Sequence, residues 1–252
     1  MWNCFNSKPS CPIAADEQQW IDFRFRWLEA QLGQDRPRKQ TVVLPTPEFF
    51  PDRYDATPED AQVMLNRVAG YMGVNPERFE LFMYSQGNHP LLTGAGGKGL
   101  AGADGLYIQQ GTPGGKDPKR SRVGLEASQL ADPLRLVATL AHEIAHEILL
   151  GEGRISSDEH DHEPLTDLLT VFVGLGVFTA NATIRDRGWS QGLVAGWSIG
   201  RHGYLDQHML GYGLAKFASF RGETQPPWAK HVRPDVRVVL KDSLRFLQHA
   251  AS

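Results

Sequence analysis

Two histidines and a glutamate occur in this chain with the spacing of a metal-binding helix: His142-Glu143-Ile144-Ala145-His146, an H-E-x-x-H pattern. Because residues i and i+4 share one face of an α-helix, both imidazoles can reach the same tetrahedral ion. Glu143 then lies beside the open coordination position, where it can take a proton from a metal-activated water. The five residues therefore predict a hydrolytic metal centre.

The setting of the motif favours this interpretation. Apolar residues surround the histidines along the expected helix: Leu134, Val137, Leu140, Ala141, Ile144, Ala145 and Ile148. Imidazoles in such a setting should be partly buried, and buried imidazoles need a partner such as a metal ion. The alternative is a helix whose histidines make ordinary hydrogen bonds or face solvent. Asp132-Pro133 predicts the start of this helix and Gly151 its end, which gives bounds of about 133–150.

A catalytic zinc site needs a third protein ligand, because water takes the fourth position. The metzincin pattern is excluded, since Leu149 stands where that pattern has glycine. Glu163 and Asp167 follow at a spacing of four, at the head of a second expected helix at about 164–180. Asp167 would lie in a helix that is apolar nearly all round, where a lone carboxylate is costly unless it is paired.

H-E-x-x-H followed by E-x-x-x-D resembles the signature of the gluzincin-type zinc metallopeptidases. The resemblance implies that His142, His146 and Glu163 bind Zn²⁺. It also implies that Glu143 is the general base, and that Asp167 accepts a hydrogen bond from the free N–H of a zinc-bound histidine.

Other residues near Glu163 remain alternative third ligands. Pro164 disfavours helical geometry at the residue before it, so Glu163 is predicted at the N-cap instead of inside the first turn. His160, Asp161 or His162 could then replace Glu163, and His162 is its nearest rival.

The pattern of elements predicts an α+β fold: a zincin-like metallopeptidase domain with a small mixed sheet packed on the H-E-x-x-H helix and a helical C-terminal part. Residues 1–85 form an N-terminal α/β part of the same compact unit, and residues 86–252 form the catalytic part. Helices are expected at 16–31, 58–72, 204–221 and 235–250, and strands at 41–44, 79–84, 106–108 and 122–126.

Three further segments have possible roles at a cleft. One of the strands before the metal helix is a candidate to pair with an extended substrate backbone. The glycine-rich segment Gly94–Gly115 is expected to be a mobile loop or hairpin, and a candidate lid. Tyr204, His208 and Tyr212 share a helix face that could supply a hydrogen-bond donor to an oxyanion, although packing is the commoner use of such a stripe.

Composition excludes several classes of protein. The 252 residues are 41% hydrophobic and 22% charged, with a net charge of −3, so nothing attracts nucleic acid or an anionic membrane. No apolar run reaches membrane-spanning length, and the first residues lack the pattern of a signal peptide, so a cytoplasmic protein is expected. The only cysteines, Cys4 and Cys11, are expected to be free thiols.

The sequence therefore predicts a zinc-dependent metallopeptidase. It would hydrolyse peptide bonds of a peptide or protein substrate through a metal-activated water, with Glu143 as general base. Nucleic acid and membrane are not expected as partners. Two other functions remain open: a non-catalytic binding or regulatory protein on a zincin fold, and a zinc hydrolase of a non-peptide substrate.

Overall fold

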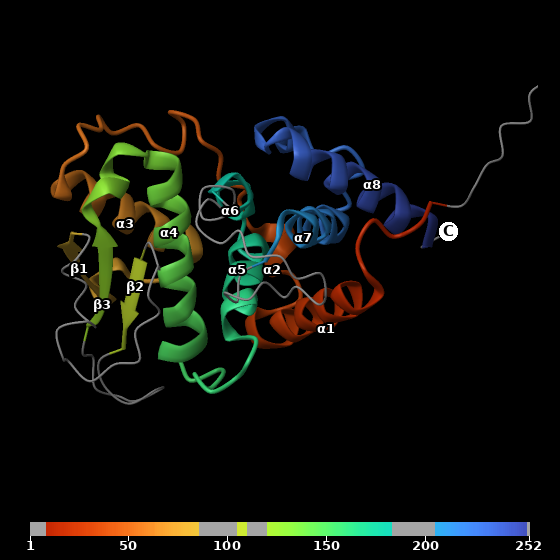
Figure 1. The fold of residues 1–252 in the computed structure, drawn as a ribbon, viewed down its shortest axis with the longest axis horizontal. Helices are drawn as coiled ribbons and strands as arrows, with labels where there is room; N and C mark the ends of the chain where they lie inside the picture. The colour runs from red at the N-terminus through yellow and green to blue at the C-terminus, as the bar shows by residue number, and fades with distance from the viewer. Residues whose placement is uncertain (1–8, 86–104, 110–119, 183–204, 251–252) are drawn as a thin grey trace, which may run out of the picture.

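A computed structural model describes residues 9–85, 105–109, 120–182 and 205–250. Within these ranges the chain is mixed α and β, with a small sheet at one end and most of the helices at the other (Figure 1). Helices α4 (Pro133–His146) and α5 (His162–Phe172) lie between the two parts. The expectation of an α+β fold with a small mixed sheet is confirmed, and one continuous cluster of buried apolar side chains runs from Ile21 to Leu244.

The described sheet has three strands in the order β1-β3-β2. Their bounds are Phe79–Tyr84 for β1, Gly105–Ile108 for β2 and Ser121–Glu126 for β3. Strand β1 pairs with β3 in parallel, and β2 pairs with β3 antiparallel. The predicted strands at 79–84, 106–108 and 122–126 are therefore confirmed to within a residue.

Helix α4 (Pro133–His146) carries the H-E-x-x-H motif and packs between the sheet and the helical part. Asp132 caps it by accepting a hydrogen bond from the Arg135 N–H at 3.3 Å, and Pro133 occupies its first position. The helix continues as a single π turn, η3 (Glu147–Gly151). Helix α3 (Pro58–Met72), with Thr57 as its cap, packs beside α4. The predicted starts of both helices are confirmed.

The remaining helices lie on the opposite side of α4 from the sheet (Figure 1). Their bounds are Ala15–Leu32 for α1, Arg36–Lys39 for α2, His162–Phe172 for α5, Gly176–Ala182 for α6, Gln207–Phe220 for α7 and Pro234–Ala250 for α8. Short 3₁₀ turns lie at Pro76–Arg78 (η1), Ala127–Ala131 (η2) and Pro227–His231 (η5). Among the described residues, no helix is long and apolar enough to span a membrane.

Two predicted elements are wrong. The single helix expected at 164–180 is divided into α5 and α6, because Gly174 adopts a left-handed backbone with φ of 83° and its carbonyl accepts from the Val43 N–H at 2.9 Å. Residues 41–44 were expected to form a strand, yet they are extended chain outside any ladder. Of the segment Gly94–Gly115, only residues 105–109 are described, so the lid expectation lies outside the described residues.

A buried ion pair fixes the start of α5 to α1. The Arg24 guanidinium donates through Nε to Asp161 Oδ2 at 2.7 Å and through a second nitrogen to Asp161 Oδ1 at 2.5 Å. The Trp20 indole N–H also donates to Asp161 Oδ2, at 2.8 Å. Burial alone would raise the pKa of Asp161, but these donors outweigh it and lower the pKa. Asp161 is thus held two residues before Glu163.

We expect Asp161→Asn to lower the free energy of unfolding by about 3 kcal/mol, because it leaves the buried Arg24 guanidinium with the partly exposed Glu159 as its remaining charge partner. Urea titration followed by circular dichroism measures this change. The exposed Asp158 provides a matched control, since Asp158→Asn makes the same chemical change in the same loop without a buried partner. A loss no larger than that of the control would contradict a stabilising role for the pair.

Candidate metal centre

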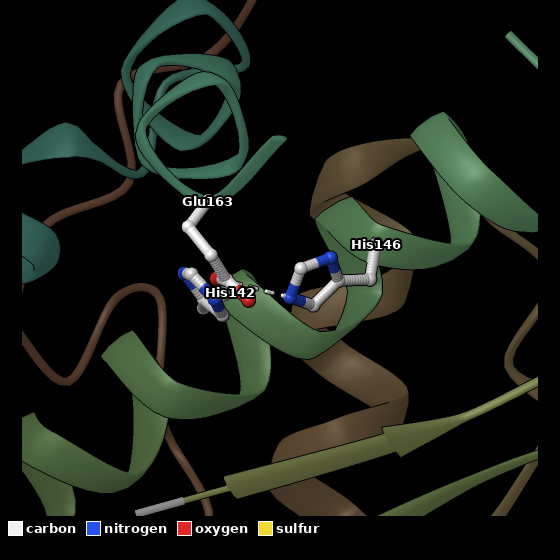
Figure 2. Close-up of side chains that lie close together, drawn as sticks. All are labelled: His142, His146 and Glu163. Atoms are coloured by element: carbon white, nitrogen blue, oxygen red, sulfur yellow. Dashed lines mark hydrogen bonds and ion pairs between the residues drawn. The ribbon is translucent and has the colours of Figure 1, made fainter. Parts of the chain in front are cut away.

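Three side chains from two helices meet at one point between α4 and α5. The ligand-type atoms of His142, His146 and Glu163 all lie within 4.8 Å of one another. Figure 2 shows Glu163 extending from α5 toward the two imidazoles on α4. Glu163 Oε2 lies 3.0 Å from His142 Nε2 and 3.5 Å from His146 Nε2. Within the described residues, this is the one histidine, cysteine and carboxylate group arranged so that it could hold a metal ion.

The two histidines converge because helical geometry places them one turn apart on the same face. Their ring centroids are 4.7 Å apart and the rings are nearly perpendicular, at 87°. Apolar residues of α4 bury the other faces of this helix in the core. As a result, the side chains of His142 and His146 are only 12% and 9% exposed.

Glu163 reaches the site from inside α5, at the second helical residue. This corrects the sequence-based expectation that Pro164 would leave Glu163 at the N-cap. Proline is tolerated here because N–H groups of the first turn have no partner within the helix. The helix therefore begins at His162, and the Glu163 side chain points toward α4.

The rival third ligands are placed differently. Asp161 is occupied by Arg24 and Trp20, and His160 is exposed. His162 lies close by, with its ring centroid 6.2 Å from that of His146. Its Nδ1 is 3.6 Å from Glu163 Oε1 and has no hydrogen-bond partner among the described residues. The structure thus brings Glu163, and not His162, together with the two histidines.

Helix α5 also supplies an acceptor to each imidazole. Asp167 Oδ1 lies 2.9 Å from His142 Nδ1, and its Oδ2 accepts from the Leu205 N–H at 3.0 Å. Thr166 Oγ1 lies 3.3 Å from His146 Nδ1 and donates its own proton to the His162 carbonyl at 2.7 Å. In a metal-loaded site, each Nδ1 would keep its proton for the acceptor on α5, and each Nε2 would offer its lone pair to the metal.

The role of Thr166 was not predicted from the sequence. Threonine within a helix is common, and the H-E-x-x-H pattern does not specify an acceptor for its second histidine. The available signal was positional, because Thr166 and Asp167 follow Glu163 by three and four residues and so share its helix face.

The electrostatics reflect this network of buried charges. Burial opposes the charged form of His142, but its hydrogen bonds to Asp167 and Glu163 outweigh that effect and raise its pKa. Burial lowers the pKa of His146. Burial alone would raise the pKa of the Glu163 carboxyl, yet the two imidazoles lower this pKa well below its ordinary value. Glu163 is therefore a carboxylate, which is the form that binds a metal.

Glu143 lies on the same helix turn but outside the three-residue cluster. It is 5% exposed, and burial raises the pKa of its carboxyl to about 7. Strand β2 covers it closely: a Cβ at Gly105 would collide with Glu143 Oε1 and with the Thr139 side chain. Only glycine at position 105 lets the strand approach this carboxylate.

The structure describes two of the three proposed oxyanion donors, Tyr212 and His208, and brings neither of them to the site. Tyr212 is fully buried and donates its hydroxyl to Asp22 Oδ1 at 3.2 Å, so it joins α7 to α1. His208 is exposed, and Tyr204 lies outside the described residues. Tyr212 therefore has a packing role, which is the commoner use of such a helix face.

We expect His146→Ala to abolish tight zinc binding, since it removes one of three ligands. Equilibrium dialysis with metal analysis measures the loss, and thermal unfolding provides an independent readout. In the unsubstituted protein, zinc at 100 times its dissociation constant should add about 2.7 kcal/mol of stability. His160→Ala is the matched control, because it removes an exposed histidine of the same region. Equal zinc binding by the two variants would contradict the assignment.

Asp167→Asn should lower metal affinity about 10-fold to 100-fold, because a neutral amide holds the His142 N–H less strongly than a carboxylate. Competition with a chromogenic chelator measures the affinity. Circular dichroism of the metal-free variant checks that it is folded. A folded variant with unchanged affinity would show that Asp167 does not orient His142.

No protein-family model, curated protein or solved structure matches this chain. The structure therefore shows a buried His-His-Glu group that could hold a metal ion, with an acceptor behind each imidazole and the buried Glu143 carboxyl beside it.

Proposed function

We propose that this protein is a zinc-dependent metallopeptidase with a gluzincin-like site on a zincin-like domain. The observation that carries the proposal is the convergence of Glu163 Oε2 on both imidazole Nε2 atoms, with Glu143 on the same turn of α4. Two histidines and one glutamate form a known donor set of catalytic zinc sites, which leave the fourth position to water or substrate.

The separations between the donor atoms fit a zinc ion. Bonds of about 2.1 Å in a tetrahedral arrangement place neighbouring ligand atoms roughly 3.4 Å apart. The distances from Glu163 Oε2 to the two Nε2 atoms are 3.0 and 3.5 Å, and no pair in the group exceeds 4.8 Å. Small rotations of these side chains would complete such a site.

Zinc held by these residues would supply a Lewis acid that polarises a scissile carbonyl and lowers the pKa of water. The protein's own contribution to proton transfer is assigned to Glu143. The Glu143 carboxyl is buried under β2 beside the donor group, where a carboxylate can accept a proton from a metal-activated water and return it. In this proposal Glu143 accepts a proton from the attacking water and then donates it to the leaving amine.

A peptide substrate is favoured by the position of β2. In the described sheet β2 is an outer strand, and its first residue lies directly on the Glu143 carboxylate. An extended peptide that paired with the outer edge of β2 would run past the metal-binding helix. Such backbone pairing would recognise a polypeptide largely independently of its sequence.

We expect Glu143→Gln to lower the rate of peptide hydrolysis by about 10²-fold to 10⁴-fold while zinc content stays unchanged, because the variant loses the base and keeps all three ligands. Cleavage of a denatured protein panel, followed by mass spectrometry, measures the activity. Glu77→Gln is the matched control at an exposed glutamate.

The same experiment separates the alternatives. Zinc binding without cleavage of any peptide in the unsubstituted protein would favour a binding protein or a hydrolase of another substrate. Full activity in Glu143→Gln would contradict the proposed mechanism directly.

A further inference from the structure

The residue that follows the second histidine, Glu147, is a buried carboxylate with no part in the proposed reaction. It is 4% exposed. Its Oε2 accepts hydrogen bonds from the Tyr107 hydroxyl and from Ser121 Oγ, each at 2.6 Å. Its Oε1 accepts from the Arg78 guanidinium. Glu147 therefore joins the metal-binding helix to three segments of the sheet region: η1, β2 and β3.

The partners of Glu147 argue against a ligand or proton-transfer role for it. Its three hydrogen-bond partners are all donors, and Arg78 supplies the opposite charge that a buried carboxylate requires. Arg78 is itself held by Glu152 at 3.0 Å. Such an arrangement fixes positions, because each donor is directed at one of two oxygen atoms on a rigid helix.

Tyr107 connects this network to the metal centre. Its ring stacks on the His146 imidazole, with the centroids 5.8 Å apart and the planes 27° apart. Its hydroxyl reaches Glu147, so one side chain contacts two consecutive residues of the helix. Burial and the adjacent Glu147 carboxylate raise the pKa of Tyr107, which keeps its hydroxyl a donor. Thr166 contacts the opposite part of the imidazole, at Nδ1.

The same strand covers Glu143. Gly105 and Tyr107 are two residues apart on β2, so both face α4. Gly105 lies on the Glu143 carboxylate, and Tyr107 lies on His146. A hydrogen bond that fixes Tyr107 therefore fixes the register of β2 over the base as well as the plane of one imidazole.

We propose that Tyr107 and Glu147 are positioning residues of the metal centre: Glu147 holds the Tyr107 hydroxyl, and the Tyr107 ring holds the imidazole of His146 and sets β2 over Glu143. This inference rests on the metal centre of the proposed function, but it does not depend on the substrate.

Two substitutions at Tyr107 test the proposal. Tyr107→Phe keeps the ring and removes the hydrogen bond to Glu147, whereas Tyr107→Leu removes the ring as well. We expect Tyr107→Phe to lower zinc and cobalt affinity about tenfold, at the lower end of the range for residues that orient a ligand, and Tyr107→Leu to lower it further. The visible absorption of the cobalt-loaded protein should shift in both variants, because the His146 ring is no longer held in one plane.

Tyr54→Phe is the matched control. The Tyr54 hydroxyl donates to the Leu130 carbonyl at 2.7 Å, so the variant loses a comparable hydrogen bond that involves neither the histidines nor Glu147. It should lose stability yet keep the cobalt spectrum and the metal affinity. If Tyr107 had only a general structural role, its substitution would change stability alone. If it positions His146, its substitution would also change the cobalt spectrum.

A double-mutant cycle with Glu147→Gln tests whether the two residues act together. If they do, the loss of metal affinity in the double variant is smaller than the product of the two single losses. Independent losses would overturn the pairing. Should Glu147→Gln fail to fold, Ser121→Ala removes a different donor to the same oxygen and tests the same carboxylate.

The outcomes separate the two proposals. Folded Tyr107 variants with the affinity and cobalt spectrum of the unsubstituted protein would overturn the positioning role while leaving the metallopeptidase proposal in place. Metal binding that depends on Tyr107, in a protein that cleaves no peptide, would support positioning and count against peptidase activity. An unsubstituted protein that binds neither zinc nor cobalt would overturn both.

Discussion

The contact of Glu163 Oε2 with two imidazole nitrogens is the interaction on which the rest of the site depends. It joins α4 to α5 at a point where every participating side chain is nearly removed from water. A carboxylate in that environment is stable only if cations or strong donors surround it. Both imidazoles lie close enough to Glu163 to stabilise it, and a bound metal ion would stabilise it more strongly. The packing of α4 against α5 and the binding of a metal ion would therefore both require Glu163 to lie against the two imidazoles.

Much of the site could be predicted from local patterns. His142, Glu143 and His146 follow from helical periodicity, and the caps at Asp132 and Thr57 follow from turn chemistry. These features depend on neighbours in the sequence, which is why a single chain reveals them. The position of Glu163 was harder to predict, since the effect of Pro164 on the preceding residue was outweighed by the anchoring of Asp161 to α1 and by the contact with the histidines.

Long-range features could not be predicted in the same way. Nothing local distinguishes Glu147 from a surface glutamate, because its partners Arg78, Tyr107 and Ser121 lie 26 to 69 residues away along the chain. The division of the second helix at Gly174 depends likewise on the approach of residue 43. Both features depend on contacts between segments that are distant in the sequence, and hydrophobic periodicity carries no information about such contacts.

The side chains of α5 have a consequence for recognising related chains. Glu163, Thr166 and Asp167 stand at positions i, i+3 and i+4 of one helix, so a single rigid element carries a candidate metal ligand and an acceptor for each histidine. Their relative placement does not depend on the loop that separates α5 from α4. A search for H-E-x-x-H followed at any distance by E-x-x-[ST]-D would therefore select chains able to build this same set of contacts, including chains whose intervening loops differ too much in length to be aligned.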